Sequence, residues 1–84
     1  MRKRRELADR NRVALVSHLK QHRARMDMTQ EELAERVGVR RQTILAVEKG
    51  HYVPSTLLAM LLADALEMSV GELFELTREE ERGR

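Results

Sequence analysis

The sequence contains no cysteine, a single proline and only two aromatic residues, Tyr52 and Phe74. The lack of cysteine excludes disulfides, cysteine-based zinc sites and a thiol nucleophile. Proteins that bind single-stranded nucleic acid usually stack the bases on aromatic side chains, so the scarcity of aromatics argues against that class. No apolar run reaches the roughly 18 residues of a membrane span, and no signal peptide is visible. We therefore expect a cytoplasmic protein.

The length of 84 residues predicts one small domain. We assign this domain to residues 9–76, with a basic arm at residues 1–8 before it and a charged tail at residues 77–84 after it. The core of so small a domain stabilises the fold only marginally, and association with a second copy would add to it.

The net charge of +2 conceals an uneven distribution of charge along the chain. Residues 1–28 carry nine Lys or Arg against three acidic residues, whereas residues 64–84 carry three basic residues against seven acidic ones. This asymmetry suits a protein that turns one side towards a polyanion. The initial MRKRR, Met1 to Arg5, is either a flexible arm that contacts DNA or a solvated chain end.

The stretch from Thr29 to Gly50 contains the most informative pattern. Thr29 followed three places later by Glu32 is a capping box, which marks the start of a helix. Gly38 is suited to end that helix, because glycine adopts the left-handed conformation without strain. The stretch therefore predicts a first short helix, a tight turn, and a second helix from about Arg41 to Lys49.

The second of these helices has two distinct faces. Ile44 and Val47 are spaced to lie on the inner face, whereas the outer face carries Arg41, Gln42, Ala46 and Lys49. Arg and Gln side chains can make paired hydrogen bonds to guanine and adenine edges in the major groove of DNA. The two helices together predict a helix-turn-helix with a recognition helix.

Helical patterns also occupy the rest of the chain. Apolar spacing predicts a helix from about Asp9 to Arg25 and an apolar helix from Ser55 to Leu66. Ser69 and Glu72 form a second capping box, which begins a fifth helix. For residues 77–84 we expect a frayed end or a weak helical extension.

The order and spacing of these residues resemble the helix-turn-helix family of Cro and the phage repressors, the λ-repressor-like or XRE family. The resemblance runs from about Leu15 to Phe74 and implies an all-α, compact five-helix DNA-binding domain with the helix-turn-helix at helices 2 and 3. The motifs that carry it are Arg23, Thr29-Gln30-x-x-Leu33-Ala34, Gly38-Val39, Arg41-Gln42-Thr43-Ile44, Glu48-x-Gly50, Tyr52-x-Pro54-Ser55 and Ser69-Val70-x-Glu72-Leu73-Phe74.

The resemblance also assigns roles to individual residues. It implies a structural ion pair between Arg23 and Glu48, and a brace from Gln30 to the first recognition residue. The residues implied to contact bases are Arg41, Gln42, Leu45 and Ala46. Those implied to contact the DNA backbone are Thr29, Gln30, Arg40, Thr43, Lys49, His51 and Tyr52.

Leu57 and Leu61 depart from the family, which usually has polar residues at these positions. The two leucines are four residues apart and form a second apolar stripe on their helix. An exposed apolar stripe on a small domain indicates an interface with a second copy or with a partner protein, and Leu76 extends it. The alternative is local packing against the terminal segments of the same chain.

We therefore interpret the sequence as a transcriptional regulator that occupies an operator on double-stranded DNA as a homodimer. The alternatives are the antitoxin of a toxin–antitoxin pair and a protein-interaction module on the same fold. An enzyme is not expected, because no nucleophile, acid–base pair or ligand set converges. Nor is a cofactor or metal, since His18 and His22 lack the further ligands that a zinc site needs.

Overall fold

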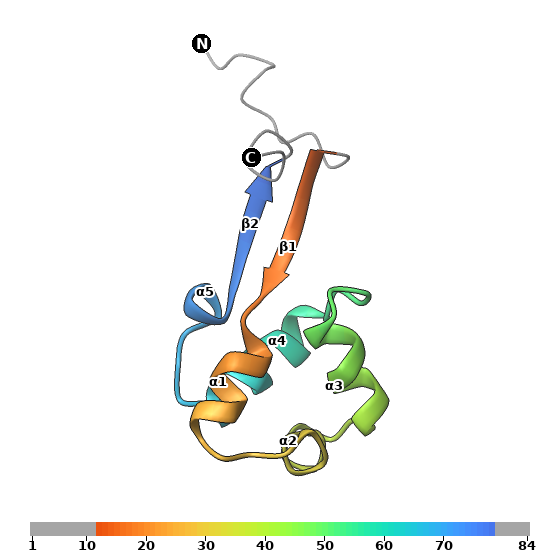
Figure 1. The fold of residues 1–84 in the computed structure, drawn as a ribbon, viewed down its shortest axis with the longest axis vertical. Coiled ribbons are helices and arrows are strands. Elements are labelled where there is room, and N and C mark those ends of the chain that lie inside the picture. Colours follow the sequence, from red (N-terminus) through yellow and green to blue (C-terminus); the bar gives the residue numbers. More distant parts are fainter. Residues whose placement is uncertain (1–11, 79–84) are drawn as a thin grey trace.

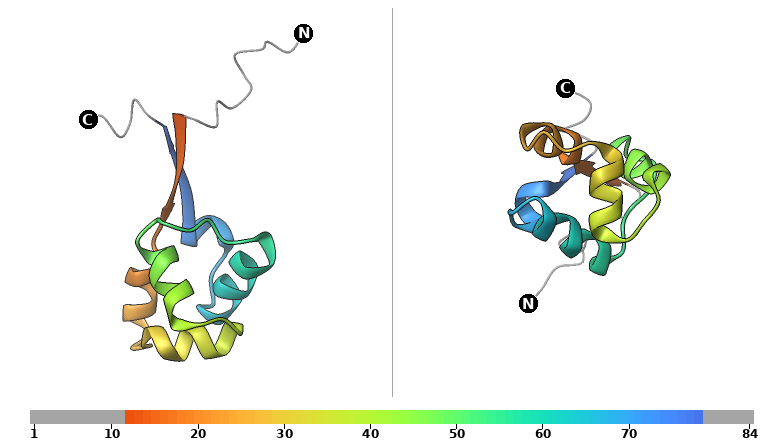
Figure 2. Two further views of the ribbon diagram at one scale, coloured as in Figure 1. Left: turned by 90° about the vertical axis from the view of Figure 1, so that its right-hand side faces the viewer. Right: turned by 90° about the horizontal axis from the view of Figure 1, so that it is seen from below.

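The computed structural model describes residues 12–78, which form five helices and a two-stranded antiparallel sheet (Figure 1). The helices gather into one body, and the two strands form a ribbon that projects from it. Helix α2 crosses the end of this body that lies opposite the ribbon (Figure 2). In chain order the elements are β1 (Val13–Ser17), α1 (Leu19–Arg25), α2 (Gln30–Val37), α3 (Arg41–Glu48), α4 (Thr56–Ala65), α5 (Val70–Leu73) and β2 (Phe74–Arg78).

Every residue that is buried as a whole in the described part of the chain is hydrophobic. Each of the five helices contributes one side chain with no exposed surface: Leu19, Leu33, Ile44, Leu62 and Leu73. Burial of a leucine or isoleucine side chain contributes roughly 1.5–3 kcal/mol. The inner apolar face and outer polar face predicted for α3 are consistent with this arrangement, and α2 likewise buries Leu33, Ala34 and Val37.

The predicted helix ends are confirmed at most positions. Thr29 and Glu32 form a complete capping box at the start of α2, and Ser69 with Glu72 forms the second box at α5. Gly38 ends α2 in the left-handed conformation, with φ of 74°. Asp27 has φ of 53° in the turn before α2, a conformation that Asp tolerates better than most residues. These ends depend on local chemistry, which a sequence displays directly.

The expectation of an all-α fold was wrong, because residues 13–17 and 74–78 form strands. The helix predicted from Asp9 begins only at Leu19, and β1 pairs with β2 in an antiparallel register that places Leu15 opposite Leu76. The backbone N–H of His18 donates to the carbonyl of Leu73 at 2.9 Å and joins the ribbon to the helical body.

A strand signal is present in both segments, and in the first it coexists with a helical period. Residues 13–17 read VALVS, which contains two β-branched valines. Residues 74–78 read FELTR, in which apolar and polar side chains alternate from Phe74 to Thr77. The spacing of Val13, Val16 and Leu19 also fits a helix face. Pairing with β2, at the other end of the described chain, settles the choice in favour of a strand.

The structure tests only a small part of the two terminal assignments. The basic arm at residues 1–8 lies outside the described residues, and so does most of the tail. Thr77 and Arg78, assigned above to the frayed or helical tail, instead belong to β2. Within residues 12–78, no helix is both long and apolar enough to cross a membrane.

Candidate nucleic-acid interface

The outer face of α3 presents the side chains predicted to contact bases. Arg41 and Gln42 are exposed in its first turn, and Leu45 and Ala46 are partly exposed one turn later. The other side of the helix is fixed by Ile44 and Val47, whose exposures are 0% and 1%. A rigid, buried inner face thus sets the direction in which the polar outer face points.

The turn between α2 and α3 is short and internally bonded. Gly38 is left-handed, and the N–H of Val39 donates to the carbonyl of Ala34 at 3.0 Å. Arg40 is the N-cap residue of α3, but its side chain makes no capping hydrogen bond. The start of α3 therefore lacks the stabilisation that Ser or Thr would supply, and it carries a positive charge instead.

The residues predicted to contact the DNA backbone lie around both ends of α3. Gln30, at the start of α2, is hydrogen-bonded to Arg41 and so lies beside the first turn of α3. At the other end, the N–H of His51 donates to the carbonyl of Ala46 at 2.9 Å, which fixes the exit of the chain from the helix. Exposed side chains among the predicted set are Thr29, Arg40, Lys49, His51 and Tyr52, whereas Gln30 and Thr43 are partly buried.

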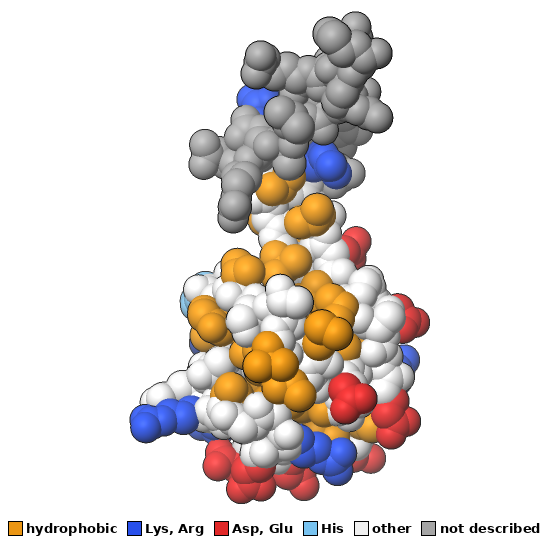
Figure 3. Space-filling view, turned by 180° about the vertical axis from the view of Figure 1, so that it is seen from behind, with side chains coloured by type: hydrophobic (Ala, Val, Ile, Leu, Met, Phe, Trp, Pro, Cys, Tyr) orange, Lys and Arg blue, Asp and Glu red, His pale blue; other side chains and the backbone are white. Residues whose placement is uncertain are grey.

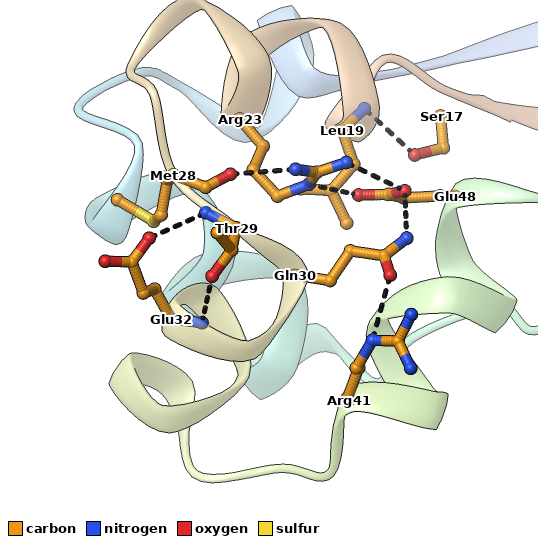
Figure 4. Close-up of polar contacts among 9 residues, drawn as sticks. All are labelled: Ser17, Leu19, Arg23, Met28, Thr29, Gln30, Glu32, Arg41 and Glu48. Atoms are coloured by element: carbon orange, nitrogen blue, oxygen red, sulfur yellow. Dashed lines mark hydrogen bonds and ion pairs between the residues drawn. The ribbon is translucent and has the colours of Figure 1, made fainter.

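Arg23 in α1 and Glu48 in α3 form an ion pair in the interior (Figure 4). Arg23 Nε donates to Glu48 Oε2 at 2.7 Å, and Arg23 Nη1 donates to the carbonyl of Met28 at 2.8 Å. The side chains are 13% and 3% exposed, respectively. Three segments, namely α1, the turn before α2, and α3, are therefore joined by one guanidinium group.

Gln30 extends this network to the exposed face, as Figure 4 shows. Its Nε2 donates to Glu48 Oε1 at 3.0 Å, and its Oε1 accepts from Arg41 Nε at 3.2 Å. The link between Gln30 and Glu48 was not foreseen from the sequence. The two residues belong to different helices, and no local spacing relates them.

Both capping glutamates have perturbed acidity. The backbone N–H of Thr29 donates to Glu32 Oε1 at 2.8 Å and lowers the pKa of this carboxyl below its ordinary value of about 4.5. The backbone N–H of Ser69 lowers the pKa of Glu72 in the same way, with smaller contributions from nearby His22 and Arg25. The hydrogen bonds that cause these shifts stabilise the two helix ends. The shifts are therefore not signs of acid–base chemistry.

The apolar residues predicted to form an interface lie on two adjoining grooves. Leu57 and Leu61, 69% and 38% exposed, line a groove of about 680 Å³ between α2, α3 and α4. Leu76, 58% exposed, lines a groove of about 410 Å³ beside the ribbon. Tyr52 borders both grooves. Figure 3 shows hydrophobic side chains across this side of the molecule, with charged side chains mainly at its rim.

His18 is the N-cap residue of α1, and His22 lies within this helix. The ring of His18 contacts the carboxylate of Glu75 in β2, and His22 is half-buried near Glu72. No group of three His, Asp or Glu side chains between residues 12 and 78 is arranged to hold a metal ion.

A glycine-ended α2, a short turn and an α3 that exposes Arg41 and Gln42 on its outer face form a helix-turn-helix. A family model for the helix-turn-helix matches residues 19–73, and the chain belongs to this family, in its XRE-type branch of DNA-binding transcriptional regulators.

Similar proteins occur in bacteria and archaea. The chain is 49% identical over 65 residues to the HTH-type transcriptional regulator YgzD of Bacillus subtilis, with 77% of this chain and 98% of YgzD covered. It is 60% identical over 48 residues to an HTH-type transcriptional regulator of Methanothermobacter thermautotrophicus, with 57% and 70% covered.

Two solved structures resemble the fold. The clp gene regulator ClgR of Corynebacterium glutamicum matches with a TM-score of 0.62 and 31% identity, over 64% of this chain and 57% of that one. This chain thus spans little more than half of the ClgR chain. The transcriptional regulator VanUg matches with a TM-score of 0.67 over 81% and 91% of the two chains, and its 23% identity supports the fold alone.

Proposed function

We propose that this protein is a cytoplasmic, sequence-specific transcriptional regulator that occupies an operator on double-stranded DNA as a homodimer. The observation that carries the proposal is the exposure of Arg41 and Gln42 on the outer face of α3, above a buried inner face. An exposed arginine and glutamine on a rigid helix offer the donors and acceptors that major-groove edges require.

In this proposal α3 enters the major groove. Arg41 donates two hydrogen bonds to a guanine, and Gln42 pairs with an adenine, each giving roughly 1–3 kcal/mol of discrimination. Leu45 and Ala46, one turn later and partly exposed, contact bases through apolar surface, for which the methyl group of thymine is the natural partner. These residues select the sequence.

Affinity comes chiefly from the DNA backbone. Lys49 and Arg40 supply positive charge at the two ends of α3, and the N-terminus of α2 presents backbone N–H groups beside Gln30. Thr29, Thr43, His51 and Tyr52 complete the proposed backbone contacts.

Two copies are needed to read two half-sites. Helix-turn-helix dimers place their recognition helices about one helical turn of DNA apart, roughly 34 Å. The exposed side chains of Leu57 and Leu61 on α4 are our proposed dimer face. They lie beside α3 on the side of the groove away from Gln42, Thr43 and Ala46, which the proposal leaves free to contact DNA. A two-fold axis through this face would fix the spacing between the two copies of α3.

The proposal is tested by fluorescence anisotropy with a duplex library and with the DNA upstream of the protein's own gene, each over a series of salt concentrations. We expect sequence-selective binding whose affinity falls steeply with salt, as phosphate contacts require. Equal, weak binding to every duplex at low salt would contradict the proposal.

A protein partner such as a toxin is a second candidate, and the exposed apolar residues near the ribbon favour it. Val53, Met60 and Leu76 are 69%, 58% and 58% exposed, and they extend the apolar side beyond the Leu57–Leu61 groove. In this case the protein would be isolated from its source cells in a defined complex with a second chain. A homogeneous dimer of this chain alone would count against it.

A further inference from the structure

Glu48 makes more hydrogen bonds than an ion pair with Arg23 requires. Its buried carboxylate accepts from Arg23 Nε at 2.7 Å, from Arg23 Nη2 at 3.4 Å and from Gln30 Nε2 at 3.0 Å. An ionised carboxylate has only acceptors, so any group that faces it must donate. The carboxylate therefore dictates which end of the Gln30 amide points inwards.

The orientation of Gln30 in turn dictates what it offers to Arg41. With the NH₂ group directed at Glu48, the carbonyl oxygen Oε1 faces the first turn of α3, where it accepts from Arg41 Nε at 3.2 Å. The flipped amide would place its oxygen against the carboxylate and its NH₂ group against a guanidinium. Both contacts of the flipped amide would be repulsive, so the network admits one orientation only.

From this geometry we infer that Glu48 is a specificity-positioning residue, whose carboxylate orients the Gln30 amide and thereby holds Arg41 in the conformation that contacts its base. The inference rests on the proposed function, in which Arg41 contacts a base. It adds that the sequence preference of an exposed residue depends on a carboxylate that the DNA never touches.

The chemistry of arginine makes the arrangement useful. The guanidinium group has five N–H donors in a fixed plane. Gln30 engages Nε, which leaves the N–H groups on Nη1 and Nη2 for the two acceptors of a guanine edge. Because Gln30 already holds the Arg41 guanidinium through Nε, the side chain loses less conformational entropy when the base contact forms.

The test separates positioning from simple stabilisation with two matched variants. Glu48→Gln removes the obligatory acceptor, since its new amide can present either an oxygen or an NH₂ group to Gln30. Arg23→Lys also weakens the ion pair but leaves the carboxylate of Glu48 in place. Both variants, together with Arg41→Ala, are assayed on duplexes that vary the base at each position of the selected site, at a temperature where circular dichroism shows each variant to be folded.

Arg41→Ala first identifies the position whose base preference depends on Arg41. At that position we expect Glu48→Gln to lose about tenfold in preference, within the range of one bidentate contact. We expect Arg23→Lys to keep its preference within about twofold, because Gln30 remains oriented. Binding to unrelated DNA should change little in either variant.

Each outcome has a distinct meaning. A wild-type protein without any base preference would overturn the proposed function itself. A wild-type preference that survives in Glu48→Gln, or that Arg23→Lys loses equally, would overturn the positioning role and leave Glu48 as scaffold. If Glu48→Gln does not fold, Gln30→Met breaks the bridge and leaves the Arg23–Glu48 pair intact. Retention of the preference in that variant would likewise overturn the inference.

Discussion

Arg23 and Glu48 form an almost fully buried ion pair, 2.7 Å between Nε and Oε2, that ties α1 to the C-terminal end of α3. Removal of one partner would leave the other charge buried and uncompensated, which typically costs 3–5 kcal/mol. We expect Arg23→Met to lower the free energy of unfolding by roughly 3–5 kcal/mol in urea denaturation.

A matched double variant tests the cause of this loss. In Arg23→Met with Glu48→Met no charge is left buried, so we expect it to be more stable than Arg23→Met alone. If the double variant is the less stable of the two, apolar packing rather than the unpaired charge governs this site.

Arg41→Ala should flatten the base preference at one position of each half-site. The expected loss of discrimination is about 1–3 kcal/mol, because one bidentate contact is removed. Lys49→Ala is the comparison, since an exposed lysine beyond the end of α3 is proposed to contact phosphate. It should weaken binding to all sequences alike and reduce the salt dependence. Competition binding against single-base variants of the site measures the effects of both substitutions. If Arg41→Ala lowered the affinity equally for every sequence, this would argue against a base contact.

The capping box at α2 predicts a specific loss of stability in acid. Because the pKa of Glu32 lies below its ordinary value of about 4.5 in the folded protein, its stabilising effect is complete above that pH. The effect declines as the pH falls below about 4.5 and through the lowered pKa. Glu32→Gln should remove this part of the pH dependence in thermal unfolding curves between pH 3 and 7. Glu31→Gln removes a charge from the same turn without altering the box, and an equal effect there would point to the helix dipole instead.

If the protein dimerises through the groove lined by Leu57 and Leu61, charged side chains in this groove should prevent self-association. Leu57→Glu with Leu61→Glu would bury two carboxylates in the proposed dimer face, and we expect the protein to sediment as a monomer in analytical ultracentrifugation. Leu76→Thr is the comparison, because Leu76 pairs with Leu15 across the ribbon and lies on the adjoining groove. If Leu76→Thr alone dissociates the dimer and the glutamate pair does not, the interface lies on the ribbon.

Much of the helical body was predictable because its signals are local. The starts of α2 and α5 follow from capping boxes, and the end of α2 follows from a glycine within one turn. The faces of α2 and α3 follow from apolar spacing. The order of motifs along the chain then pointed to the helix-turn-helix family, whose model matches residues 19–73.

The ribbon was not predicted, since its two strands stabilise each other across the whole described chain. Val13–Ser17 has a composition that fits both a strand and the apolar face of a helix. Only pairing with Phe74–Arg78 supplies the hydrogen bonds that make the extended conformation favourable. A two-stranded ribbon is marginal by itself, so its attachment to the helical body matters as well.

Where most helices begin and end, and which of their residues face the core, could be read from the sequence, because these features depend on neighbours within a few residues. The order of the motifs along the chain indicated the family. The tertiary structure alone decided the ribbon, the separation of Leu76 from the Leu57–Leu61 groove, and the position of Gln30 between Glu48 and Arg41. These features depend on hydrogen bonds and packing between segments distant in the chain, and their geometry exists only once the helices have packed.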